Sequence, residues 1–374
     1  MQHKRESMYE YKGLQDIFFV MLYGGATLLA VMACLYLLLT RGNMFSSAIN
    51  PPKALRRWTA AFMASVAASH VWWVMLGMYW LTDDRLTRNI VAITLDRLTF
   101  VPLMMVVLLR MLQDRRRPLW PVFVAMIPFA VTAVVSLVKH NNDFEWFIEI
   151  YSILLALSFT VYFVFAVRQY GRWLHENFAD LEHKEVWQSL LLLAFILLVF
   201  MAYASNGGAL GTEYLAQINT LIIITFILWR VETLQQLDAM ESSEASEESE
   251  ESAVASNANN IGALLELHCE ATRLYLQHDL TLQQLAITIG TNRTYLSNYF
   301  AQQGITYNAY INRLRIEHFM RLHLTNRNLL QPATAAILAQ QSGFHSYTTF
   351  SIAFKKHTGT TVTAWMKAES MSDK

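Results

Sequence analysis

The chain has 374 residues, of which 54% are apolar and only 16% charged, so it is more apolar than an ordinary soluble domain. Its formal net charge is zero, but residues 262–374 contain ten lysines and arginines against six acids, and residues 238–251 contain seven acids and no base. Two cysteines are too few for a disulfide framework or a cysteine-based zinc site, and we expect no metal and no cofactor. A basic end behind an acidic strip indicates an anionic partner.

The first 237 residues contain seven apolar runs separated by polar breaks. They cover residues 17–39, 58–81, 90–112, 120–138, 146–167, 186–204 and 214–229. Each run is about long enough for an α-helix to cross a hydrocarbon core of about 30 Å, and backbone groups in lipid have to be paired within the segment. We therefore predict a seven-helix transmembrane domain over residues 17–237, embedded in a lipid bilayer.

Basic residues fall unevenly on the two sides that seven crossings define. Twelve lysines and arginines lie on the side of the C-terminus and six lie on the other side. Because cytoplasmic loops carry the excess of basic residues, the C-terminus is predicted to lie in the cytoplasm. Residues 1–16 then form an extracytoplasmic tail.

Three ionisable residues fall inside the apolar runs: His70, Asp96 and Arg97. Charges inside a membrane are costly and mark candidate functional sites. Since Asp96 and Arg97 are neighbours in sequence, they point about 100° apart on a helix, and each needs a partner on another helix. One hypothesis is that they fix the bundle through such partners, and the other is that they belong to a signal-sensing site.

The stretch ESSEASEESEES at residues 241–252 is too polar to bury. We therefore predict a disordered linker over residues 238–260. Just before it, Ile227, Val231 and Leu234 stand at coiled-coil-like spacing. These three residues could seed a parallel homodimer, or the helix could simply fray out of the bilayer.

Residues 279–319 carry a helix-turn-helix pattern. Thr281 followed by Gln284 forms a capping box for a first short helix. Gly290 permits a sharp turn, and Asn292 can cap a second helix. The outward face of that second helix presents residue types that bond base edges or phosphates: Arg293, Thr294, Ser297 and Asn298.

A second copy of this pattern follows about fifty residues later, with its turn at Gly343. The outward face of its second helix carries Ser346, Tyr347, Thr348 and Ser351, and Lys355 and Lys356 stand at its end for phosphates. Taken singly, Arg293 or the two lysines could be ordinary solvated surface residues. Their placement at the outward edges of two reading helices favours a role in DNA binding.

Together these stretches resemble the AraC/XylS family of bacterial transcription regulators. The likeness rests on LAITIGTNRTYLSNYF, QQGITYNAYINRLRIEHF and QSGFHSYTTFSIAFKKHTG, in this order, and covers about residues 265–366. It implies an all-α tail domain, taken as residues 261–374, in which a linker helix at about 307–323 holds two helix-turn-helix units. Their reading helices would enter successive major grooves about 34 Å apart. Arg315 matches the family's usual arginine on the linker helix, whereas Phe319, Ala335 and Ile352 depart from the family pattern.

The sequence thus predicts a one-component transcription regulator of the bacterial inner membrane. In this hypothesis the bundle senses a signal and modulates sequence-specific binding of the tail domain to double-stranded DNA, with no enzymatic activity. The signal stays open between a small ligand, a membrane property and a partner membrane protein. The alternative is an integral membrane enzyme or carrier whose tail is a protein-interaction module.

Overall fold

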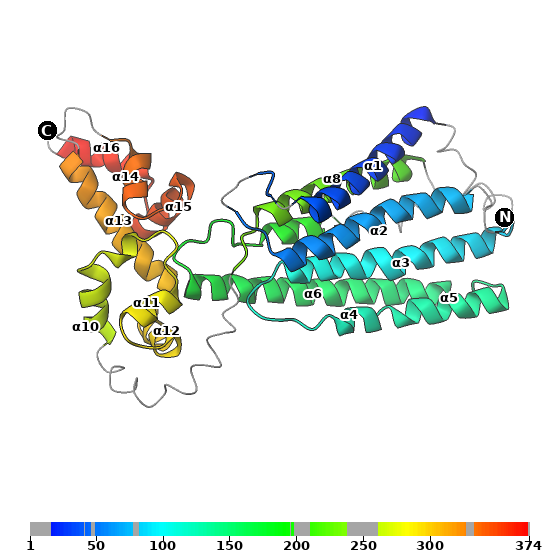
Figure 1. Ribbon diagram of the computed structural model, residues 1–374, viewed down its shortest axis with the longest axis horizontal. Helices are drawn as coiled ribbons and strands as arrows, with labels where there is room; N and C mark the ends of the chain where they lie inside the picture. Colours follow the sequence, from blue (N-terminus) through cyan, green and yellow to red (C-terminus); the bar gives the residue numbers. More distant parts are fainter. Residues whose placement is uncertain are drawn as a thin grey trace. The chain divides into compact units, whose positions relative to one another are not determined.

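The computed structural model describes residues 16–40, 42–45, 49–77, 82–194, 196–197, 210–237, 261–326 and 333–372 (Figure 1). Regular structure in these residues is helical, apart from one isolated β-bridge between Phe178 and Thr281. The all-α prediction is confirmed. The chain divides into two compact units, the first comprising Met1–Tyr170 and Val186–Leu237 and the second comprising Gly171–Glu185 and Asp238–Lys374.

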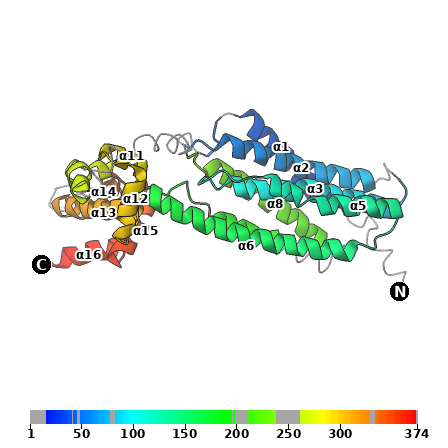
Figure 2. The same ribbon diagram turned by 90° about the horizontal axis from the view of Figure 1, so that it is seen from below.

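The first unit is a bundle of long helices that lie lengthwise beside one another (Figures 1 and 2). Its elements are α1 (Ile17–Leu39), α2 (Lys53–Gly77), α3 (Arg85–Arg110), α4 (Trp120–Val124), α5 (Ile127–Lys139), the part of α6 (Glu145–Asn177) up to Tyr170, and α8 (Leu210–Thr233). Helix α1 packs on α2 and α8, α2 packs on α3 and α8, and α3 packs on α4 and α5.

Six spans in the described residues are long and apolar enough to cross a membrane. They correspond to six of the seven predicted runs. The remaining run, 186–204, is helical at residues 188–194 and 196–197, while residues 195 and 198–204 lie outside the described part of the chain. The count of seven crossings therefore stays a prediction. So do the tail at residues 1–16, of which only Asp16 is described, and the linker at residues 238–260, which lies outside the described part of the chain.

The fourth run differs from its prediction as one continuous helix. It contains two helices, α4 and α5, separated by a turn at Ala125 and Met126. Pro128 stands in the first turn of α5. Proline has no N–H to donate to the preceding turn, and its ring crowds the carbonyl four residues earlier, so one helix ends and a new one begins there.

Helix α1 illustrates how the apolar runs pack. Ala26, Ala30 and Ala33 share one face and are at most 3% exposed. Small side chains of this kind allow neighbouring helices to approach closely. Other positions expose large apolar side chains such as Met21 and Leu28. A lipid bilayer would cover these side chains, whereas water would not.

The last described helix of the bundle, α8, buries the three residues at coiled-coil-like spacing. Ile227, Val231 and Leu234 are each 0% exposed within the first unit. The hypothesis of a dimer seam on these residues is wrong, because the bundle itself fills their surroundings. The end of α8 does not fray either. The carboxylate of Glu232 is buried, pairs with Nε of Arg56 at 3.1 Å and accepts from the Tyr36 hydroxyl at 2.8 Å.

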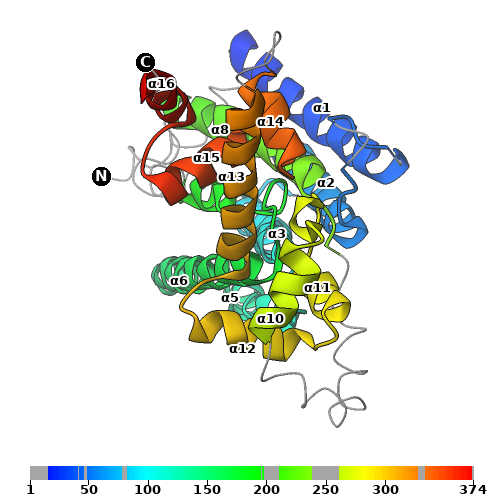
Figure 3. The same ribbon diagram turned by 90° about the vertical axis from the view of Figure 1, so that its left-hand side faces the viewer.

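The second unit is a helical domain built around one long helix, α13 (Tyr307–Asn326). Short helical segments pack near the first half of α13: α10 (Ile261–Leu265), a π-helical turn (Glu266–Glu270), a 3₁₀ turn (Leu274–Leu276), α11 (Leu282–Thr288) and α12 (Arg293–Gln302). Near its other half lie α14 (Ala335–Gln341), α15 (Tyr347–Thr358) and α16 (Val362–Ser372). Figure 3 shows the two groups at the two ends of α13.

Candidate nucleic-acid interface

The first helix-turn-helix, α11 and α12, forms as its sequence predicts. The Thr281 hydroxyl accepts from N–H of Gln284 at 3.2 Å, and the Gln284 side chain accepts from N–H of Thr281 at 2.9 Å. Gly290 has φ of 72° in the turn, a conformation that favours glycine. Asn292 then caps α12 through N–H of Tyr295 at 2.8 Å. These local bonds satisfy helix-end donors and fix where each helix begins.

The second helix-turn-helix, formed by α14 and α15, is built in the same way. Thr334 caps α14, and Ser346 caps α15 by accepting from N–H of Thr349 at 3.3 Å. Gly343 holds the turn with φ of 89°. Phe350 and Phe354 of α15 are fully buried and anchor this helix in the domain.

Helix α13 joins the two helix-turn-helix units because it contributes to both apolar cores. Ile311 and Leu314 pack in the core of the first helix-turn-helix, and Ile316 and Phe319 pack in the core of the second helix-turn-helix. One straight segment therefore fixes the spacing of α12 and α15. The predicted linker helix is confirmed, and it runs three residues further than predicted, to Asn326.

Arg315 ties the two cores together. Only 1% of this residue is exposed, and its guanidinium donates to the carbonyl oxygens of Tyr275, Gln277 and His278 at 2.6 to 3.2 Å. The same guanidinium lies 5.7 Å from the ring centroid of Phe344, in the second helix-turn-helix. Burial lowers the pKa of this arginine, but a guanidinium with charged neighbours and three acceptors stays protonated. Its position indicates a structural role, not contact with DNA.

The predicted contact residues differ in how open they are. On α12, Thr294 and Asn298 are exposed, whereas Arg293 and Ser297 are half-buried. On α15, Tyr347 and Thr348 are exposed, as are Lys355 and Lys356 at its end, and Ser351 is half-buried. The hydroxyl of Ser346 is occupied by its capping bond. Ile352, where family members often have arginine, is 65% exposed and offers only an apolar surface.

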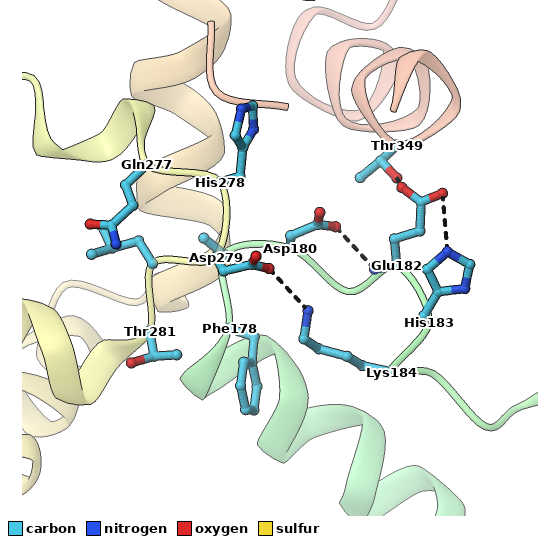
Figure 4. Close-up of polar contacts among 12 residues, drawn as sticks. Phe178, Asp180, Glu182, His183, Lys184, Gln277, His278, Asp279, Thr281 and Thr349 are labelled. Carbon is cyan, nitrogen blue, oxygen red and sulfur yellow. Dashed lines mark hydrogen bonds and ion pairs between the residues drawn. The ribbon is translucent and has the colours of Figure 1, made fainter. Parts of the chain in front are cut away.

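Sequence reasoning missed a second set of residues at this face, in the segment Gly171–Glu185. The side-chain oxygen of Asn177 accepts from Nε of Arg293 at 2.9 Å. A carboxylate oxygen of Glu182 accepts from the Thr349 hydroxyl at 3.4 Å (Figure 4). No local sequence pattern predicts these contacts, because the two residues of each pair are 116 and 167 residues apart in the chain.

Burial shifts the pKa of two further side chains in the domain. Burial, with a contribution from Glu270, raises the pKa of the Cys269 thiol to about 12. The thiol is therefore protonated at neutral pH and is neither a nucleophile nor a metal ligand. Burial and the nearby Arg321 and Arg273 lower the pKa of His318, whose ring faces the hydroxyl of Tyr275. In the described part of the chain no group of three His, Cys, Asp or Glu side chains could hold a metal ion.

The three ionisable residues singled out in the apolar runs have different partners. Asp96 accepts from the Ser69 hydroxyl at 2.6 Å and from the indole nitrogen of Trp73 at 2.7 Å. His70 is bonded to the side chain of Gln217 at 2.9 Å. The guanidinium of Arg97 lies 5.5 Å from the ring centroid of Phe129 on α5. Asp96 and Arg97 thus contact different helices, as their 100° separation requires, and they are not brought together into one site.

Comparison with known proteins identifies the tail. Residues 285–368 match the family model of a helix-turn-helix domain, of the AraC type. A curated relative, an uncharacterised helix-turn-helix-type transcriptional regulator of Staphylococcus aureus, is 33% identical over 91 residues, which is 24% of this chain and 12% of the relative. The chain thus covers about an eighth of that relative's length. No solved structure matches the chain.

Proposed function

We propose that this chain is a membrane-bound one-component transcription regulator. The AraC-type domain would bind specific double-stranded DNA, and the apolar helices would anchor it in a membrane and sense a signal. One observation carries the proposal: a single chain joins two capped reading helices, held on one rigid linker helix, to at least six helices apolar enough to span a bilayer. DNA reading by two helix-turn-helix units requires such a fixed spacing.

Individual residues then take distinct roles. Asn298 and Thr294 on α12, with Tyr347 and Thr348 on α15, are the exposed side chains able to reach base edges. Lys355 and Lys356, at the end of α15, would bind phosphates and fix the register of the domain on the duplex. Arg293 would contact DNA once its bond to Asn177 is released.

The distribution of basic residues supports a bacterial inner-membrane location with the tail in the cytoplasm and the N-terminus outside. The linker over residues 238–260 would tether the tail. The roughly 20 residues from 238 to 257 would span about 25 Å as a flexible coil. The proposed domains are the bundle at residues 17–237, the linker at 238–260 and the tail at 261–374. The segment Gly171–Glu185 groups with the tail.

A signal can change DNA affinity only by the difference in its interaction free energy with two states of the protein. The polar contacts of His70 and Asp96 join α2 to α8 and α3, so they are where a bound ligand or a partner membrane protein would favour one arrangement of helices. Pairing of two tail domains would be a second route, through effective concentration.

Genome-wide mapping of DNA bound by the intact, membrane-embedded protein tests the proposal. We expect discrete sites that share a motif with two half-sites about one helical turn apart. The matched control is the double variant Asn298→Ala/Thr348→Ala, which removes one exposed side chain from each reading helix. Absence of sites above background, or equal occupancy with the double variant, would count against a sequence-specific regulator and favour a tail that binds protein.

A further inference from the structure

The segment Gly171–Glu185 is built into the surface of the tail domain through its backbone. Phe178 forms an antiparallel bridge with Thr281, and N–H of Ala179 donates to the carbonyl oxygen of Leu280 at 3.3 Å. Nδ2 of Asn308 donates to the carbonyl oxygens of Phe178 and Ala179 at 3.2 and 2.7 Å. The side chain of Ala179 is 1% exposed, within the apolar core of the first helix-turn-helix unit. The domain thus recognises an extended segment much as it would a bound peptide.

Charged side chains fix the rest of the segment. Lys184 is buried, and its ammonium lies 3.7 Å from a carboxylate oxygen of Asp279 and 5.6 Å from the ring centroid of Phe178 (Figure 4). Asp180 is 3% exposed and accepts from N–H of Glu182 at 3.0 Å, which turns the chain back toward α15. Buried charges persist only where they are paired or bonded, so these contacts define one docked conformation.

The docked segment occupies side chains of both reading helices. Asn177 holds Nε of Arg293 at the start of α12, and Glu182 holds the hydroxyl of Thr349 in the first turn of α15. Glu176 and Ser297 line the same cleft, of about 300 Å³, beside α12. The segment has four acids against two bases, so it also brings net negative charge to a face that would meet phosphates.

We infer that residues 171–185 are an internal ligand of the DNA-binding domain and compete with DNA for α12 and α15. This inference rests on the proposed function. In the chain the segment lies between the fifth and sixth predicted spans, so a rearrangement of the bundle can shift the balance between the docked and the released segment. With the segment released, Arg293 regains its full set of donors for a phosphate or a guanine. The simpler alternative is a permanent structural support that leaves DNA binding unchanged.

A reversible disulfide separates the two alternatives. Paired residues on antiparallel strands have Cα atoms about 4.5 to 5.5 Å apart, which suits a disulfide, so Phe178→Cys/Thr281→Cys should lock the segment when oxidised. The single variant Thr281→Cys is the matched control, because it carries the same loss of the α11 cap. Cys269 does not interfere, since it is fully buried and its thiol is protonated. The whole chain is placed in lipid nanodiscs, and binding to a random-sequence duplex of about 40 base pairs, long enough for two successive major grooves, is measured by fluorescence anisotropy.

We expect the oxidised double variant to bind this duplex at least about tenfold more weakly than the same protein after reduction. Oxidation should not change binding by the Thr281→Cys control. Equal binding in the oxidised and reduced states would overturn the inference, and so would failure of the crosslink to form in protein without DNA. If the reduced variant and the control bind no DNA at all, the proposed function itself fails, which is a distinct result.

A release variant, in which the docked segment loses its contacts to the reading helices, should bind DNA more tightly. Asn177→Ala removes the acceptor of Arg293, and Glu182→Gln removes the charge beside Thr349, so the double variant should bind the duplex about three- to tenfold more tightly than the native chain. Glu185→Gln is the control for charge, because Glu185 has no hydrogen bond or ion pair among the described residues. Unchanged or weaker binding by the release variant would contradict competition and indicate a support that DNA binding needs.

Discussion

Nε of Arg315 lies 2.7 Å from the carbonyl oxygen of Tyr275, in the turn that precedes the first helix-turn-helix. The same guanidinium lies over the ring of Phe344, in the turn of the second. One buried side chain on α13 therefore sets both units against the linker helix. Arg315, which matches the usual arginine of the AraC/XylS family on this helix, therefore acts by positioning the reading helices.

The variant Arg315→Met tests that role. It should leave the buried carbonyl oxygen of Tyr275 and the part-buried ones of Gln277 and His278 without this donor, and destabilise the tail domain by about 2 to 4 kcal/mol. Native-state hydrogen exchange of the α13 amides in the solubilised chain measures the change. Arg313→Met is the control, because Arg313 is exposed, pairs with Glu317 at 3.4 Å and lies 5.6 Å from the ring centroid of Tyr310 at the surface. Its expected effect is below about 0.5 kcal/mol, and equal effects of the two substitutions would refute the structural role.

Two glycines with positive φ predict different tolerance to alanine. A Cβ at Gly343 would stand 2.9 Å from the Cα and carbonyl oxygen of Leu276, whereas a Cβ at Gly359 would have nothing within 4 Å. Both substitutions strain the backbone by about 1 kcal/mol. Gly343→Ala also forces backbone against backbone, so it should cost more than about 2 kcal/mol in all. Thermal unfolding of the tail measures the difference, and similar losses would contradict the close approach.

Lysines and amides at the reading face should act differently on DNA binding. Lys355→Gln/Lys356→Gln should weaken binding to all sequences and reduce the slope of log K against log salt by about 1.8, or about 0.9 per phosphate contact. Asn298→Ala should leave the slope unchanged and relax preference at one base pair by about 1 to 3 kcal/mol. Titrations at several salt concentrations, with Lys367→Gln on α16 as the control, distinguish the two. If Asn298→Ala reduces the slope of log K against log salt, Asn298 contacts the DNA phosphate backbone and not a base edge.

The tail domain should lose stability in mild acid through His318. Its pKa in the folded domain lies below the ordinary value of about 6.5, so the unfolded chain binds more protons once the pH falls through that value. Stability is therefore retained above about pH 6.5 and declines below it. In His318→Gln this decline should be smaller, and in the exposed-residue control His357→Gln it should match the native chain. Denaturant unfolding between pH 7 and pH 5 provides the comparison, and identical declines in all three proteins would exclude His318 as the cause.

Local signals predicted most of the tail domain. The capping residues Thr281 and Asn292, and glycines at the two turns, fixed the helix ends because each acts within a few residues of itself. Apolar length likewise predicted the long helices of the bundle. It failed at Pro128, where a locally missing donor outweighed the continuous apolar pattern.

These local signals could not predict contacts between distant parts of the chain. Ile227, Val231 and Leu234 have the spacing of a dimer seam, and only the packing of the bundle shows that the seam is filled. Helix α6 continues ten residues past the predicted end of its run, to Asn177, where the docked segment begins.

The sequence by itself determined an apolar helical bundle, a polar acidic strip and a double helix-turn-helix tail, because helix length, periodicity and caps are short-range properties. Only the tertiary structure decided that Asn177 reaches Arg293 and that Asn308 holds the backbone of Ala179. These bonds form between residues more than a hundred positions apart. Their strength depends on shape, burial and pairing that exist only once both partners are folded.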